Sequence, residues 1–242
     1  MKTPHHLTAL LLGAITFTAF GQNQVASNAP AITATTPVDA KAKADAELAR
    51  KAADWVPSLK LNDPAKEARV TEVIATHLKT IRDWHNEHPF TTVPAGINPI
   101  TGKPLSQLDR QIIANSAMPK SVHENLMAGL RQDLTAGQVE AVLDKYTVGK
   151  VAFTMNGYHG IIPDMTKEEE AFIMTQLKQA REEGVDYKNM DQISTIFKIH
   201  KTRIEQYLND NGRNWKLMYK AFVASLKTKK AGTNAPGVEP VP

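Results

Sequence analysis

The residues best suited to chemistry in this 242-residue chain are charged side chains on two successive stretches of its second half. Arg181, Glu182 and Asp186 fall within about one and a half turns of one predicted helix. Lys201 and Arg203 lie on the next predicted helix, beyond a connector short enough to make the two helices antiparallel neighbours. We expect the two groups to approach each other across that interface. The favoured interpretation is a structural salt-bridge network, and the alternative is a site in which arginine binds a sugar carboxylate with two parallel hydrogen bonds.

A second candidate site lies in a glycine-rich segment, residues 148–162, which we predict to be an extended, turn-rich connector that can include a short strand. Asn156 and Tyr158 lie within this segment. A tyrosine ring on a constrained loop can stack on a sugar while an amide hydrogen-bonds to its hydroxyls. The alternative, held equally, is a tight turn that packs Tyr158 into the helical core.

The histidines make a weaker case for a site. His85 and His88 are three residues apart near the end of a predicted helix, a spacing that can bind zinc or copper. A third ligand is not evident in the sequence, and histidine is favourable near the negative end of a helix dipole. His200 falls on an apolar stripe between Phe197 and Ile204 and is predicted to be a hydrogen-bonded core residue. We therefore predict neither a metal nor a cofactor.

Several enzyme classes lack their signatures in this chain. It has no cysteine for thiol catalysis, and no nucleophile elbow, phosphate-binding loop, dinucleotide fingerprint or metalloprotease motif. These absences weigh against an enzyme but leave the question open, because paired carboxylates have no spacing signature. The formal net charge of +4 is modest for a nucleic-acid partner, which we do not expect. A mild basic excess fits an anionic polysaccharide or oligosaccharide slightly better.

The elements that must position these residues are predicted to be helices. Thr135 with Gln138, and Thr166 with Glu169, have the spacing of capping boxes, in which side chains bond the free amides at a helix start. Residues 88–103 are rich in proline and glycine and predict a long loop instead. The fold class is therefore predicted to be all-α: an antiparallel helical bundle with one long proline-rich loop and the glycine-rich connector.

The last predicted helix carries large apolar residues at helical spacing: Trp215, Met218, Phe222 and Leu226. We expect this stripe to be buried against the helix that carries Phe197 and Ile204. Burial of that kind would make the last helix part of the main core.

Both ends of the chain are predicted to lie outside the folded domain. Residues 1–21 combine an early lysine, a short apolar run and a small-residue cleavage site, which is the pattern of a secretory signal peptide. The apolar run is too short for stable membrane insertion. Residues 22–40 and 231–242 are predicted to be disordered, which leaves a single helical domain at residues 41–230. The mature protein is expected to be exported, to the periplasm or the medium.

A longer pattern runs through the second half of the chain. Its residues are Leu134, Thr135, Gln138, Val139, Asp144, Thr147, Gly149, Val151, Thr154, Tyr158, Pro163, Thr166, Glu168, Ala180, Arg181, Glu182, Asp186, Phe197, Lys201, Arg203, Ile204, Tyr207 and Leu208. This pattern resembles a family of exported bacterial proteins known only as domain of unknown function 3826. Residues 60–84 resemble the family's first long helix, whereas residues 187–190, Ser194 and Ile196 depart from its pattern. A polar site of the family at those positions would be altered here.

The resemblance implies an exported α-helical protein without an established activity, often from bacteria that degrade complex polysaccharides. The leading hypothesis is a non-enzymatic binding or accessory protein linked to polysaccharide handling. One alternative is a carbohydrate-active enzyme that uses carboxylates and basic residues, and another is an envelope stress chaperone. A deep polar pocket would favour the enzyme, a shallow aromatic platform the binding protein, and an exposed apolar cradle the chaperone.

Overall fold

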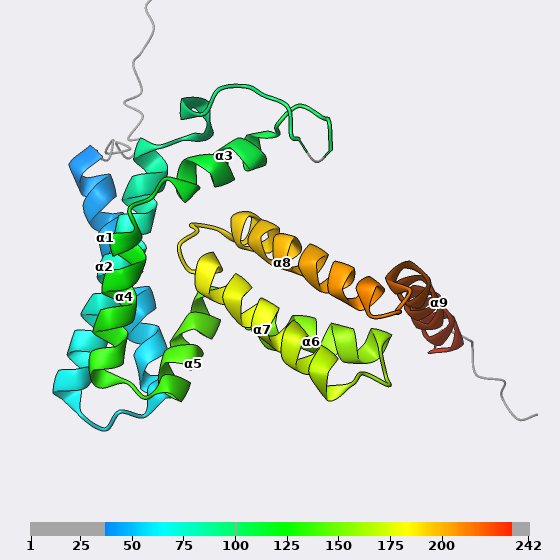
Figure 1. The fold of residues 1–242 in the computed structure, drawn as a ribbon. Helices are drawn as coiled ribbons and strands as arrows, with labels where there is room; N and C mark the ends of the chain where they lie inside the picture. Colours follow the sequence, from blue (N-terminus) through cyan, green and yellow to red (C-terminus); the bar gives the residue numbers. More distant parts are fainter. Residues whose placement is uncertain (1–36, 100, 234–242) are drawn as a thin grey trace, which may run out of the picture. The chain divides into compact units, whose positions relative to one another are not determined.

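The computed structural model describes residues 37–99 and 101–233 (Figure 1). Their regular secondary structure is helical, apart from an isolated bridge between Ile97 and Pro104. The α-helices are α1 (Pro37–Trp55), α2 (Pro64–Glu87), α3 (Gln107–Ser116), α4 (Lys120–Asp133), α5 (Ala136–Tyr146), α6 (Lys150–Ile161), α7 (Lys167–Gly184), α8 (Met190–Asp210) and α9 (Trp215–Thr233). Two short 3-10 helices are η1 (Val56–Leu59) and η2 (Phe90–Thr92). The prediction of an all-α helical bundle is confirmed.

Two apolar clusters form the core of the described residues. The first joins α1, α2, α4 and α5, and its buried side chains include Val70, Ile74, Leu126, Leu130 and Val142. The second joins α6, α7 and α8, and its buried side chains include Tyr158, Ile173, Leu177, Ile204 and Leu208. Each of these helices contributes buried residues mostly at intervals of three or four, so one face of the helix is turned toward the core. Helix α7 packs extensively on α8 and also contacts α5 and α6, so it links the two clusters.

The helix starts follow the chemistry of the sequence. Thr135 and Thr166 both form the capping boxes predicted from their spacing. A further capping box, Ser106 with Asp109, starts α3. At the start of α2, Asp63 accepts hydrogen bonds from the amides of residues 65 and 66. These local interactions fix where α2, α3, α5 and α7 begin, and they are readable from sequence alone.

The glycine-rich segment is not a connector. It folds as α6, whose residues Val151, Met155 and Tyr158 are buried in the second cluster. The prediction was wrong because it treated glycine as a turn signal, whereas Gly160 lies within a helix and close to a side chain of α9. A Cβ atom at Gly160 would lie 3.0 Å from the ring of Phe222 on α9. Gly149 alone acts as a turn glycine, with a left-handed φ of 66° at the N-cap.

The prediction for the last helix was also wrong. None of its side chains that the structure describes, which extend to residue 228, is fully buried. Trp215 and Met218 pack partly against the second cluster, and Phe222 lies against Gly160 of α6 rather than inside the core. Leu226 is 47% exposed. Helix α9 contacts α6 and α8 and lies beside their ends (Figure 1).

The boundaries of the folded part differ slightly from those predicted. Helix α1 begins at Pro37, inside the predicted spacer, because proline is compatible with a first helical turn and Asp39 is favourable there. Helix α9 reaches Thr233, beyond the predicted limit at residue 230, since no proline intervenes before Pro236. The predicted signal peptide, most of the spacer and the rest of the tail lie outside the described residues. No helix among the described residues is both long and apolar enough to cross a membrane.

The long loop of residues 88–103 is held by its neighbours, within the positions that are described. Its path includes η2 and the bridge between Ile97 and Pro104. The guanidinium of Arg110 on α3 donates to the carbonyl of Val93, with a distance of 2.8 Å from Nε to the oxygen. The side-chain amide of Gln111 donates to the carbonyl of His88. Helix α3 therefore fixes the loop through hydrogen bonds that its backbone cannot make itself.

We expect Gly129→Ala to destabilise the protein by about 1–3 kcal/mol. A Cβ atom at Gly129 on α4 would lie 2.7 Å from a methyl carbon of Val73 on α2, so either the Val73 side chain or the two helices would have to shift. The matched control is Gly137→Ala on α5, where no atom lies within 4 Å of the new methyl group. That change should be neutral or stabilising, since alanine favours a helix over glycine. Urea denaturation of both variants measures the difference, and equal stabilities would contradict the close α2–α4 contact.

Candidate functional site

Asp186 is bonded to two histidines from different helices. It lies just after α7, where Val185 ends the helix. One carboxylate oxygen, Oδ1, is 3.0 Å from Nε2 of His77 on α2. The other, Oδ2, is 3.0 Å from Nδ1 of His123 on α4. An ionised carboxylate can only accept hydrogen bonds, so both ring nitrogens donate to it. Asp186 therefore fixes the orientation of both rings and ties α7 to α2 and α4.

Tyr146, His77, Asp186, His123 and Glu182 form a connected row of polar side chains. This row continues into the first cluster through His77. Its Nδ1 is 3.1 Å from the hydroxyl of Tyr146 on α5. Since Nε2 of His77 donates to Asp186, a neutral His77 accepts from the tyrosine hydroxyl through Nδ1. Burial raises the pKa of Tyr146 well above its usual value, and the charge of Asp186 adds to this effect, so the hydroxyl keeps its proton. Trp55 packs edge-on against the same tyrosine ring.

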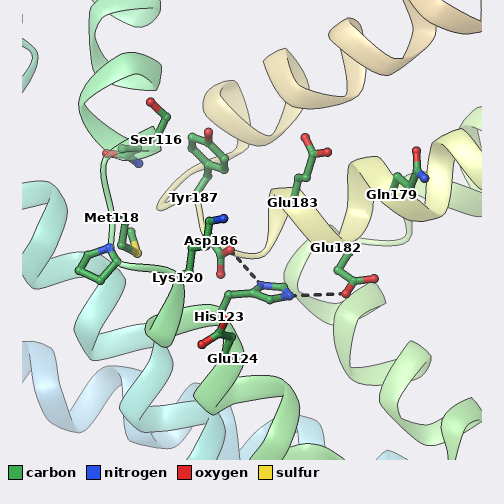
Figure 2. A pocket seen from close by; sticks show the side chains of 12 residues that line it. Ser116, Met118, Lys120, His123, Glu124, Gln179, Glu182, Glu183, Asp186 and Tyr187 are labelled. Atoms are coloured by element: carbon green, nitrogen blue, oxygen red, sulfur yellow. Dashed lines mark hydrogen bonds and ion pairs between the residues drawn. The ribbon is translucent and has the colours of Figure 1, made fainter.

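At its other end the row reaches an open cleft. Nε2 of His123 lies 3.5 Å from Oε1 of Glu182 on α7, as Figure 2 shows. The cleft has a volume of about 600 Å³ and lies between α7 and the segment that joins α3 to α4. Its lining residues are Asn115, Ser116, Met118, Pro119, Lys120, His123, Glu124, Gln179, Glu182, Glu183, Asp186 and Tyr187. Carboxylates outnumber cations, while two amides and one tyrosine add neutral polar groups.

The electrostatics of the row favour a charged pair. The hydrogen bond to Asp186 raises the pKa of His123 against the opposing effect of partial burial, and Glu182 adds to the rise. Burial alone would raise the pKa of Asp186, but the hydrogen bonds from His123 and His77 outweigh it and lower the value. Burial and the charges of Glu183 and Asp186 raise the pKa of Tyr187 to about 12. The cleft therefore presents a neutral phenol, a protonatable imidazole and several carboxylates.

His123→Asn is expected to cost most stability at mildly acidic pH. The pKa of His123 is raised on folding, so its contribution is full below the unfolded value of about 6.5 and is lost as pH rises through the folded pKa. The lowered pKa of Asp186 acts in the opposite sense: its contribution is present above about pH 4 and is lost as pH falls further. Urea denaturation of the wild type and the variant at about pH 5.5 and about pH 8.5 tests this. A difference in unfolding free energy that does not change with pH would contradict the pairing.

Glu183 connects the rim of the cleft to the second cluster. Its Oε1 is 3.2 Å from Nε2 of His200, whose side chain is fully buried on α8. Nδ1 of His200 lies 3.1 Å from the side-chain oxygen of Gln176 on α7. The prediction that His200 is a hydrogen-bonded core residue is confirmed. Burial of this ring between two α7 partners helps to fix the face that α7 turns toward the cleft.

The predicted groups of charged residues are not brought together as expected. Glu182 and Asp186 both line the cleft, but Arg181 turns the other way and donates to Asp144 on α5 at 2.8 Å. No ion pair of the described residues joins Arg181 or Glu182 to Lys201 or Arg203 on α8, so the predicted salt bridge is not present; Arg181 pairs with Asp144 and Glu182 with His123 instead. Helices α7 and α8 pack mainly through apolar side chains, and the charged contact described between them joins Glu183 to His200.

The second predicted site is divided by the helix that carries it. Tyr158 is buried on the inner face of α6, with its ring centroid 5.4 Å from that of Trp215. Asn156 is exposed, and neither residue lines the cleft. The structure thus agrees with the alternative that packs Tyr158 into the core. His85 and His88 also differ in environment: His88 stacks on Trp84, and His85 lies near Lys188. Within the described part of the chain, no group of three or more ligand side chains could hold a metal.

Sequence reasoning missed His77, Tyr146 and His123. They lie on α2, α5 and α4, and His77 is 109 residues from Asp186. A weak signal was present, since His77 falls on the buried stripe of α2 between Ile74 and Ile81. A polar residue at such a position needs a hydrogen-bonding partner. The partner could not be named without the fold.

Together, the fold and the cleft define an all-α protein with a polar, histidine- and carboxylate-lined site between helices. The family model of the Protein of unknown function (DUF3826) matches residues 45–228, and the chain belongs to this family. A comparison with curated proteins finds no match. The match includes α4, α7 and every residue of the row from Tyr146 to Glu182. Both the clusters and the cleft therefore belong to the family domain.

Proposed function

We propose that this chain is an exported binding or accessory protein that holds a neutral oligosaccharide in the cleft between α4 and α7. The observation that carries the proposal is the row Asp186–His123–Glu182, which positions a carboxylate at the cleft. Carboxylates, amides and a tyrosine are the groups that hydrogen-bond to sugar hydroxyls or stack on sugar rings. Gln179 supplies an amide and Tyr187 the tyrosine in the same cleft.

The charge of the cleft selects the kind of sugar. Glu124, Glu182, Glu183 and Asp186 face it, with Lys120 as the single lysine and His123 as the single histidine among its lining residues. Like charges in a confined site repel, so a uronic acid or a sulfated sugar would be bound poorly. The anionic polysaccharide expected from the net charge of the chain is therefore replaced, for this cleft, by a neutral one. Export of the protein is also part of the proposal, because the predicted signal peptide lies outside the residues that the structure describes.

The proposal is tested by isothermal calorimetry with Glu182→Gln and a matched control. We expect the substitution to weaken binding of a neutral oligosaccharide about tenfold or more, because a charged acceptor in a hydrogen bond contributes more than a neutral one. Glu87→Gln, at the exposed end of α2, changes the net charge equally and should leave affinity unchanged. Neutral oligosaccharides from several plant and bacterial glycans serve as probes. Selective binding of uronate oligosaccharides instead would overturn the proposal.

A second candidate function is acid–base catalysis on a sugar substrate. The observation in its favour is the raised pKa of His123, which lies beside Glu182 in the cleft, since a titratable group with a shifted pKa in a cleft is typical of catalytic sites. His123→Gln separates the two functions. For an enzyme, turnover of a bound oligosaccharide would fall by about 10²-fold or more while binding changes little. A polar cleft offers no apolar cradle, so the chaperone hypothesis gains no support from it.

A further inference from the structure

Helix α9 has a composition unlike that of the other helices. Between residues 215 and 233 it contains five lysines and neither aspartate nor glutamate. It also carries large apolar and aromatic side chains that the core does not cover. Leu217 is 61% exposed, Tyr219 50% and Leu226 47%. This combination of exposed apolar surface and exclusively positive charge needs a physical explanation.

Tyr219 and Leu226 share one face of α9, whereas Leu217, two residues before Tyr219, lies on nearly the opposite side. Residues three or four apart, and seven apart, share a face of a helix. Tyr219 and Leu226 are seven apart, and half-buried Val223 lies between them on the same row. Trp215, Met218 and Phe222 occupy the adjoining row and pack against the rest of the protein. The apolar stripe is therefore wider than the domain covers, and its outer row faces solvent.

A row of lysines follows the outer edge of that stripe. Lys216, Lys220 and Lys227 are spaced four and seven residues apart and are all exposed. No ion pair involving them is present in the described part of the chain. Unpaired lysines next to exposed Tyr219 and Leu226 place positive charge beside apolar surface. That arrangement is typical of helices that lie in the interface of an anionic bilayer.

We propose that α9 docks the protein on the surface of an anionic phospholipid membrane. Tyr219 and Leu226 insert among the acyl chains while the lysine row binds lipid phosphates. The apolar row favours lipid over a soluble polyanion, because a soluble polyanion would engage the lysines and leave Tyr219 and Leu226 in water. The attachment is peripheral, and it is independent of what the cleft between α4 and α7 binds.

The proposal is tested by co-sedimentation of the purified chain with lipid vesicles. Vesicles of phosphatidylcholine alone are compared with vesicles that also contain phosphatidylglycerol, and all protein variants share the same N-terminus. We expect binding to the anionic vesicles only. Lys220→Glu with Lys227→Glu should weaken it about tenfold or more, and Leu226→Ser should weaken it several-fold without any change of charge.

The control is Lys43→Glu with Lys145→Glu, which alters net charge equally at exposed positions on α1 and α5. It should bind like the wild type. Helical circular dichroism and thermal unfolding of each variant show that the fold is retained. Three results would each overturn the proposal: no vesicle binding by the wild type, equal losses in the control variant, or binding to dextran sulfate as strong as to vesicles and unaffected by Leu226→Ser.

Discussion

Asp186→Ala is expected to lower the free energy of unfolding by about 2–4 kcal/mol. The substitution removes both acceptors of the row and leaves His77, whose side chain is only 2% exposed, without its carboxylate. A buried imidazole that loses its partner retains the cost of desolvation and loses the compensating hydrogen bond. The side chain of Asp186 is itself 25% exposed, which keeps the effect below that of a fully buried ion pair.

Urea denaturation of the full chain measures this loss. Asp54→Asn, at an exposed position on α1, is the control and should change stability by no more than about 0.5 kcal/mol. The Asp186 variant should also bind oligosaccharide more weakly, because His123 and Glu182 lose the residue that positions them. A loss of stability below about 1 kcal/mol would mean that the two histidines find other partners, and the row would no longer explain the site.

Leu177→Ala is expected to cost about 3–5 kcal/mol, near the upper end of the range for such changes. Leu177 is fully buried on α7, at the centre of the second cluster with Ile173 and Ile204. The loss combines the transfer free energy of the removed methyl groups with the cavity left between packed helices. Leu177→Met, which nearly conserves volume, should cost less than about 1.5 kcal/mol.

Leu177→Ala also distinguishes the stability of the fold from ligand binding in the cleft. Leu177 faces the second cluster, whereas Glu182 lies on the part of α7 that faces the cleft. Under conditions where Leu177→Ala is still folded, we expect its affinity for oligosaccharide to equal that of the wild type. Calorimetry at low temperature in the absence of denaturant checks this. A large loss of affinity in folded Leu177→Ala would show that packing in the second cluster controls the cleft.

The sequence was most informative where structure depends on neighbours along the chain. The capping boxes at Thr135 and Thr166 depend on residues three positions away, so the starts of α5 and α7 could be predicted from local chemistry. The helix around Gly160 could not be predicted in this way, because Gly160 contacts Phe222, which lies more than sixty residues later in the chain. Local propensity favours a turn at such a glycine, and tertiary packing overrides it.

The site was only half predictable for the same reason. Glu182 and Asp186 were identified because they lie close together in sequence, but their charge partners were assigned to the wrong helix. Sequence spacing shows which residues share a helix face, not which helix covers that face. His77 and His123 reach Asp186 from α2 and α4, across separations that only the fold closes. Residues that meet in this way leave no pattern in a single sequence.

The most direct test of the account is a nuclear magnetic resonance titration of the imidazole signals with a neutral oligosaccharide that binds in calorimetry. We expect the His123 ring signals to shift in proportion to ligand occupancy, because this ring lies in the cleft beside Glu182. The signals of His159, which lies on the exposed side of α6, should stay in place. Shifts at His159 with an unchanged His123 would contradict a carbohydrate site in this cleft.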